Sequence, residues 1–91
     1  MTTYRATLIC KGLTDAEGAA AVDDILEEFR ARPWHTDVSC AWLDGSLRLS
    51  ASNDYDHDGM ALLDEYWDAI HICINYTSAI NVSVVEVTKQ G

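Results

Sequence analysis

The stretch VSCAWLDGSLRLSA, from Val38 to Ala51, decides the fold. Apolar residues alternate with polar or small ones on both sides of Asp44-Gly45, and this period of two is typical of a strand with one buried face. Asp-Gly between two alternating runs is a strong hairpin signal, because both central residues of a type I′ turn need a positive φ. Residues 36–43 and 47–51 are therefore predicted to form neighbouring antiparallel strands.

A strand and a helix are predicted before this hairpin. Residues 3–11 alternate between two faces, and Gly12 ends the pattern. Thr14 and Glu17 have the spacing of a capping box, which starts a helix. The helix then shows one apolar stripe at helical spacing, made of Val22, Ile25, Leu26 and Phe29. Pro33 bars its continuation, so the helix is expected to end shortly before that residue.

A second helix and a last strand are predicted after the hairpin. Residues 52–59 are polar and indicate a loop. The helix runs from about Asp58 to Cys73, with apolar residues at helical spacing. Residues 80–88 are rich in β-branched side chains, which favours a strand.

The element order is therefore β-α-β-β-α-β, which is the α+β ferredoxin-like sandwich. Right-handed crossovers place both helices on one face of a four-stranded antiparallel sheet, with strand order 4-1-3-2. The 91 residues are expected to form a single domain, 1–91. The fold hosts many unrelated functions, and the chain carries no motif specific to one family.

Charge narrows the choice of partners. Fifteen acidic residues against six Lys and Arg give a formal net charge of −9, and no Lys or Arg lies between Arg48 and Lys89. Binding to nucleic acid or to an anionic membrane is disfavoured, because both depend on clustered basic side chains. An acidic second half instead attracts a cation or a basic protein.

The cysteines and the start of the chain indicate a cytoplasmic protein. Cys10, Cys40 and Cys73 are odd in number and widely spaced, so neither a disulfide framework nor a zinc site is expected. Each is interpreted as a small buried hydrophobic residue. The first residues lead directly into a strand pattern and lack the apolar run of a signal peptide.

The connection between the hairpin and the second helix matches a calcium-binding pattern. Asp54, Asp56, Asp58, Gly59 and Glu65 satisfy the EF-hand spacing, in which alternate carboxylates and a final Glu surround a hard cation. The context differs, because a strand and not a helix precedes the loop. The alternative is that the aspartates cap the second helix and favour its positive N-terminal end. Calcium at Asp54, Asp56, Asp58 and Glu65 is the one metal hypothesis, and no other cofactor is expected.

The face of the sheet away from the helices is expected to be open. Its residues are small or of mixed polarity: Arg5, Thr7, Ile9, Ser39, Ala41, Arg48, Ser50, Asn81 and Ser83. Such a face is often solvated, but two sheets can also pack together through it. We therefore predict a homodimer through this face or an edge strand.

Three functions remain. The leading hypothesis is a non-enzymatic binding or interaction module that acts through the open sheet face or the acidic second half, with a basic protein as partner. The second is a calcium-binding domain at residues 54–58. The third is a small dimeric enzyme with a pocket between sheet and helices, where Trp34, Trp42, Trp67 or His71 contacts the substrate. No catalytic residue is assigned, because no recognisable catalytic set is present, and this favours the first.

Overall fold

The Asp44-Gly45 turn joins the two strands that the sequence placed side by side. The computed structural model describes residues 2–76 and 79–90. Asp44 and Gly45 have φ values of 52° and 75°, as a type I′ hairpin requires. The turn pairs β2 (Thr36–Leu43) with β3 (Ser46–Asn53) in antiparallel register.

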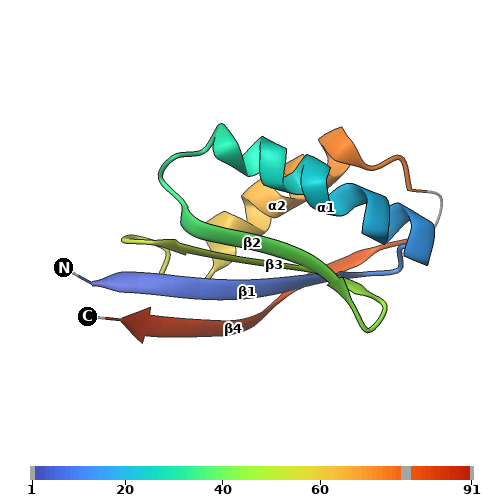
Figure 1. Cartoon of the computed structure of the whole chain (residues 1–91). Coiled ribbons are helices and arrows are strands. Elements are labelled where there is room, and N and C mark those ends of the chain that lie inside the picture. The colour runs from blue at the N-terminus through green and yellow to red at the C-terminus, as the bar shows by residue number, and fades with distance from the viewer. Residues whose placement is uncertain (1, 77–78, 91) are drawn as a thin grey trace.

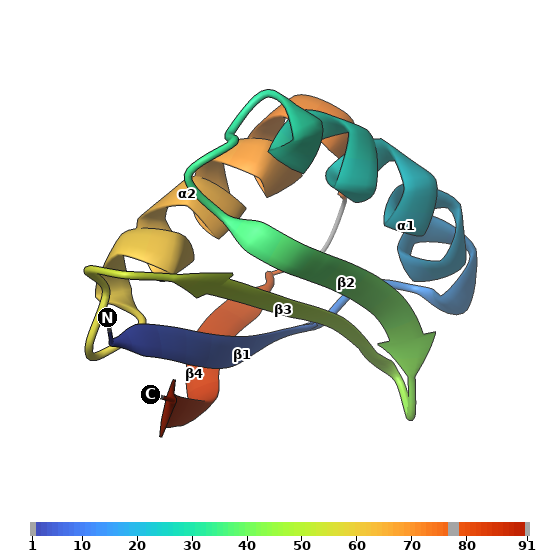
Figure 2. The same ribbon diagram turned by 60° about the vertical axis from the view of Figure 1, so that its left-hand side comes forward.

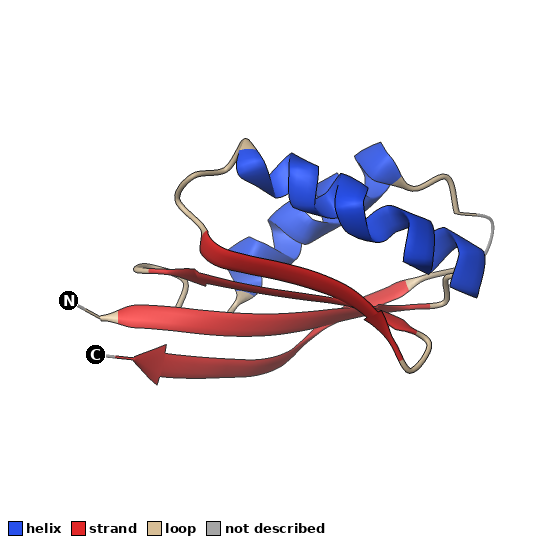
Figure 3. Cartoon of the chain, viewed as in Figure 1, coloured by secondary structure: helices blue, strands red, loops and turns tan. Residues whose placement is uncertain are grey.

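The complete order is β1, α1, β2, β3, α2, β4, and the ferredoxin-like fold is confirmed. β1 (Thr3–Lys11) lies between β3 and β4 (Asn81–Gln90), so the sheet order β2-β3-β1-β4 is the predicted order. Both α1 (Asp15–Arg30) and α2 (Met60–Cys73) cover the same face of the sheet, and the two termini lie at one end (Figure 1). The other face carries no helix, as Figure 3 shows by element type.

The predicted capping box starts α1. The Glu17 main-chain N–H donates to Thr14 Oγ1 at 3.1 Å, and the Thr14 N–H donates to Glu17 Oε1 at 2.8 Å. The first turns then pack closely on β2, because a Cβ on Gly18 would lie 2.0 Å from the Trp42 ring. Trp42 therefore fills the space that the missing side chain leaves.

The helix α2 begins two residues later than the sequence indicates. Gly59 precedes it in the left-handed region, at φ 78°, and this conformation cannot continue into a right-handed helix. A Cβ there would also meet the side chains of Val84 and Val87 on β4 at 3.0–3.3 Å. The close approach of β4 fixes the start of the helix.

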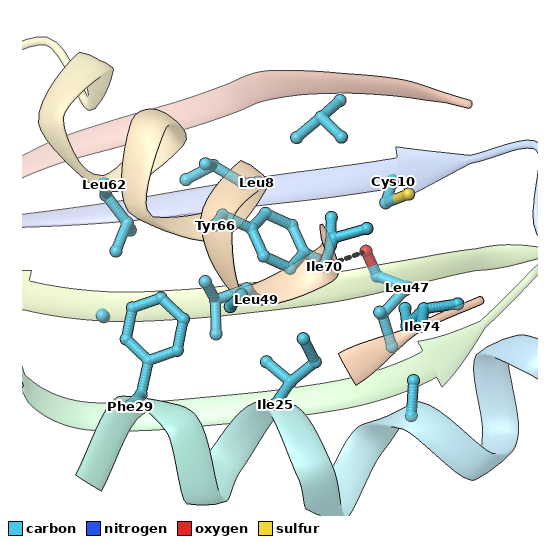
Figure 4. Close-up of a cluster of buried hydrophobic side chains, with 14 of the residues drawn as sticks. Leu8, Cys10, Ile25, Phe29, Leu47, Leu49, Leu62, Tyr66, Ile70 and Ile74 are labelled. Atoms are coloured by element: carbon cyan, nitrogen blue, oxygen red, sulfur yellow. Dashed lines mark hydrogen bonds between the residues drawn. The ribbon is translucent and has the colours of Figure 1, made fainter. Parts of the chain in front are cut away.

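The core lies between the helices and the covered face of the sheet (Figure 4). Leu8, Leu47 and Leu49 from the sheet meet Ile25 and Ile70 from the helices, all with no exposed surface. Tyr66 is also fully buried, and its hydroxyl donates to the Leu47 carbonyl at 2.9 Å. The strand residues that alternate inward are those that the sequence pattern indicated.

Two β-bulges interrupt the alternation. Between β1 and β4 the register shifts after Thr7, which leaves Val85 as the extra residue and half exposed. Between β2 and β3 the register shifts between Thr36 and Ser39, so that Asp37 and Val38 together face one residue of β3. The second bulge lies where β2 enters the sheet, beside the pocket described below.

Neither helix in the described ranges is long and apolar enough to cross a membrane.

Candidate active site: a pocket between α1 and the start of β2

A pocket opens between the C-terminal half of α1 and the beginning of β2. Its volume is about 430 Å³, within the range of about 300–1,000 Å³ that small-molecule sites occupy. It is lined by Leu26, Phe29, Arg30, Pro33, His35, Asp37 and Val38. Figure 2 shows the connection from α1 to β2 that forms one side of it. The position is between helix and sheet, as the enzyme hypothesis requires.

The lining is about half apolar and half polar. Leu26 and Phe29 from α1, Pro33 from the connection and Val38 from β2 supply the apolar surface. Arg30 is highly exposed and forms an ion pair with Glu27 at 2.6 Å. The pocket therefore suits a small organic molecule with both an apolar part and a polar group.

His35 supports the pocket from within. The His35 side chain is completely buried, and the 5% of the residue that is exposed belongs to its main chain. Nε2 lies 2.5 Å from Glu65 Oε2, and Nδ1 lies 3.3 Å from Asn53 Nδ2. With both ring nitrogens engaged inside the protein, His35 holds the connection in place and does not present a base to the pocket.

The hydrogen bonds of Asn53 determine the tautomer of His35. Asn53 Oδ1 accepts hydrogen bonds from the main-chain N–H groups of Tyr55 and Asp56, at 3.2 and 2.8 Å. The Asn53 amide nitrogen must then donate to His35 Nδ1, because it carries no acceptor. The proton of the neutral ring is thus assigned to Nε2, which donates to Glu65.

Glu65 joins this network to the surface of α2. Its other oxygen, Oε1, accepts from Trp34 Nε1 at 3.0 Å and lies 3.6 Å from Arg32 Nε. Arg32 in turn lies over the Phe29 ring, 5.3 Å from its centroid. The α1–β2 connection is therefore fastened to α2 through one carboxylate, which keeps the pocket wall in a single position.

Two of the aspartates in the calcium hypothesis are hydrogen-bonded to the start of α2. Asp56 is buried, and its carboxylate accepts from the Ala61 and Leu62 N–H groups at 3.1 and 2.9 Å. The Asp58 carboxylate accepts from the Met60 N–H at 3.0 Å, and this bond lowers its pKa. Asp54 is exposed. Asp56 and Asp58 cap α2, as the alternative interpretation expected.

Glu65 is engaged with His35 and Trp34, as described above. Within residues 2–76 and 79–90, no group of three or more His, Cys, Asp or Glu side chains is arranged to hold a metal ion. The calcium site stays a prediction.

The aromatic residues expected to contact a substrate do not line the pocket. Trp34 bonds to Glu65, and Trp42 packs on Gly18 and donates to Asp15 at 3.2 Å. His71 forms a separate cluster, in which Nδ1 meets the Trp67 carbonyl at 2.7 Å and Nε2 meets the Tyr76 hydroxyl at 3.3 Å. None of the four side chains is among the lining residues of this pocket, and their contact with a substrate stays a prediction.

The thiols offer no nucleophile. All three are free, and burial raises the pKa of Cys10 to about 11 and that of Cys40 to about 12. Cys73 lines a smaller hollow of about 170 Å³, where burial and the charges of Glu28 and Asp24 raise its pKa. A raised pKa leaves little thiolate at neutral pH, so no cysteine is assigned as a nucleophile.

Comparison with known proteins gives a likeness to a solved structure. No family model matches the chain, and no curated protein matches it. A solved structure from Chloroflexus aurantiacus J-10-fl, provisionally described as an antibiotic biosynthesis monooxygenase, matches with a TM-score of 0.50. The match covers 91% of this chain and 93% of the other at 14% sequence identity. At that identity the likeness shows a shared fold.

The leading hypothesis from the sequence, a non-enzymatic binding or interaction module, is wrong by this comparison. The neighbour with the same fold is described as an enzyme. The sequence did not reveal the pocket, because the pocket is formed by a helix end, a short connection and a bulge. None of these produces a motif in the sequence.

Proposed function

We propose that the chain is a small enzyme that binds a small organic molecule with apolar and polar parts in the pocket between α1 and β2 and transforms it there. The observation that carries the proposal is the pocket itself, with its volume of about 430 Å³ and its lining of both apolar and polar side chains. The buried contacts of His35 support it, since they hold one wall of the pocket.

Oxygenation is the reaction class that we propose to test first. The support is the description of the structural neighbour as a monooxygenase, together with a pocket of a size that suits a small organic substrate. A monooxygenase places one atom of O₂ in the product and reduces the other to water. The two electrons that reduce the second oxygen atom to water come from the substrate or from an added donor. The test is therefore made both with and without an added electron donor.

We also propose a homodimer in the cytoplasm. The free cysteines support a reducing compartment. The helix-free face of the sheet supports the dimer, because it carries small residues and the half-buried Ile9.

The experiment measures oxygen uptake with a panel of small phenols, hydroquinones and indoles, with and without NADH or reduced flavin. Products made under ¹⁸O₂ are examined by mass spectrometry for one labelled oxygen atom. Leu26→Trp fills the pocket from α1 and is expected to abolish uptake. Leu43→Trp is the matched control, because Leu43 is exposed near the hairpin turn and lies outside the pocket.

The proposal predicts uptake by the native chain and by Leu43→Trp, with labelled product, and none by Leu26→Trp. Equal uptake by both variants would remove the pocket as the site. Absence of turnover with every member of the panel would remove oxygenation of these substrate classes.

A further inference from the structure

Asp37 has an unusual backbone conformation. Its φ of 50° lies in the left-handed region, which non-glycine residues seldom occupy, although aspartate enters it more readily than most of them. Among the described residues Asp44 shares this conformation, with φ 52°, but there the hairpin turn requires it. Asp37 lies in the bulge at the start of β2 and not in a hairpin turn.

Contacts from another strand hold the bulge in place. Arg5 Nη1, on β1, donates to the Asp37 carbonyl at 2.9 Å and to Ser52 Oγ at 3.1 Å. A bulge redirects side chains that regular pairing would place elsewhere, and bulges are common beside active sites. Strained residues of this kind persist where the surrounding structure fixes them, and they gather at ligand sites.

The bulge places Asp37 in the pocket. Asp37 is exposed, and among the described residues that line the pocket it is the sole acid. Across residues 2–76 and 79–90, no hydrogen-bond or ion-pair partner for its carboxylate is found, whereas Arg30 is paired with Glu27. The carboxylate is therefore available to a ligand, and Arg30, the cation among the described lining residues, already has a partner.

We infer that Asp37 recognises the ligand of this pocket, and that the ligand is an apolar, ring-sized molecule bearing a hydrogen-bond donor, such as a phenolic hydroxyl. The inference rests on the proposed function, because it uses the same pocket. The apolar lining accepts the ring, and the carboxylate accepts the donor. An ionised carboxylate bonds more strongly to a donor than a neutral acceptor does, and it repels an anionic ligand.

The test compares two probes that differ in the donor alone, 4-ethylphenol and 4-ethylanisole, by amide chemical-shift titration. The native chain is expected to bind the phenol about tenfold more tightly, the effect of one hydrogen bond to a charged group. Asp37→Gly keeps the left-handed conformation and removes the carboxylate, so it should bind both probes equally. Asp37→Asn keeps a neutral hydrogen-bond acceptor and should retain part of the preference for 4-ethylphenol over 4-ethylanisole.

Asp44→Gly is the matched control, because it makes the same change at the other left-handed aspartate, outside the pocket. It should keep the native preference. Equal binding of the two probes to the native chain, or a preference that survives in Asp37→Gly, would overturn the role of Asp37 and leave the pocket standing. If neither probe shifts the amides of the lining residues, both the role of Asp37 and this ligand class for the proposed enzyme are refuted.

Discussion

Glu65 accepts two hydrogen bonds from residues of the α1–β2 connection, and an amide side chain cannot accept both. Its two carboxylate oxygens accept from His35 Nε2 and Trp34 Nε1, which are both donors. A glutamine would present one acceptor and one donor to the same two groups, so one donor would lose its partner. The side chain is 21% exposed, so solvent compensates only partly.

Glu65→Gln should therefore lower the free energy of unfolding by about 1–3 kcal/mol, as expected for loss of a hydrogen bond to a charged group. The measurement is urea denaturation at neutral pH. Asp64→Asn removes the same charge from the exposed side of α2 and should change stability by less than about 0.5 kcal/mol. Equal effects of the two variants would mean that the His35–Glu65 contact contributes nothing beyond charge.

Buried ionisable groups in the core make the fold sensitive to alkali. Burial raises the pKa of the Cys10 and Cys40 thiols above their usual value of 9.0, and that of the Tyr66 hydroxyl above 10.0. A folded-state pKa above the unfolded one means that stability is complete below pH about 9 and falls as the pH rises, because the unfolded chain ionises first.

The urea midpoint should be constant from neutral pH to about pH 9 and then decrease. Cys40→Ala removes one of these groups and should make the decrease shallower. A midpoint that stays level to pH 10.5 would show that the thiols are not buried as described.

At the scale of elements, the start of α2 depends on Asp56. Gly59 is the N-cap and has no side chain, so the buried Asp56 carboxylate accepts from the second and third N–H groups of the helix. Asp56→Ala should lower the free energy of unfolding by about 1–2 kcal/mol, the usual effect of losing a helix cap. Asp54→Ala, in the same loop but exposed, should have little effect, and comparable losses would contradict the capping role.

Calcium binding at this loop has a separate test. Thermal unfolding is compared in EDTA, in millimolar Ca²⁺ and in Na⁺ at the same ionic strength. Asp56 already caps the helix with both carboxylate oxygens. We therefore expect Na⁺ and Ca²⁺ to raise the melting temperature by the same amount relative to EDTA. A gain that only Ca²⁺ gives, and that Asp56→Asn abolishes, would establish the site at Asp54, Asp56, Asp58 and Glu65.

Local signals allowed most of the fold to be predicted. The Thr14–Glu17 capping box and the Asp44-Gly45 turn each lie within a few residues and depend on nearby backbone groups alone. The bulges at Asp37 and Val85 depend on the neighbouring strand, so strand periodicity gave no sign of them. For the same reason β3 extends two residues past its predicted end, through pairing with β1.

The site could not be predicted in the same way. His35, Asn53 and Glu65 come from a connection, a strand end and a helix, and only the folded chain brings them together. Glu65 matched a metal-binding pattern by spacing, yet its contacts are with residues 30 and 31 positions away. A lone histidine after Pro33-Trp34 gave no indication that it would be buried.

At the scale of the whole molecule, the helix-free face of the sheet predicts self-association. Ile9 is half-buried there, with Thr7 hydrogen-bonded to Ser50 beside it. Placing a charge at Ile9 should dissociate the homodimer while leaving the far-UV circular dichroism unchanged. Sedimentation at high micromolar concentration measures this, with Ser83→Asp on the neighbouring strand as a second variant. A native chain that sediments as a monomer would refute the dimer.

A fragment screen by NMR tests most directly whether the pocket between α1 and β2 is the active site. Small aromatic fragments are added to the labelled native chain, and the amide shifts are mapped onto the structure. We predict that the largest shifts fall on the lining residues Leu26, Phe29, Asp37 and Val38, and that Leu26→Trp removes them. Fragments that instead shift Thr7 and Ile9 on the open face, or that leave the lining residues unchanged, would contradict the claim.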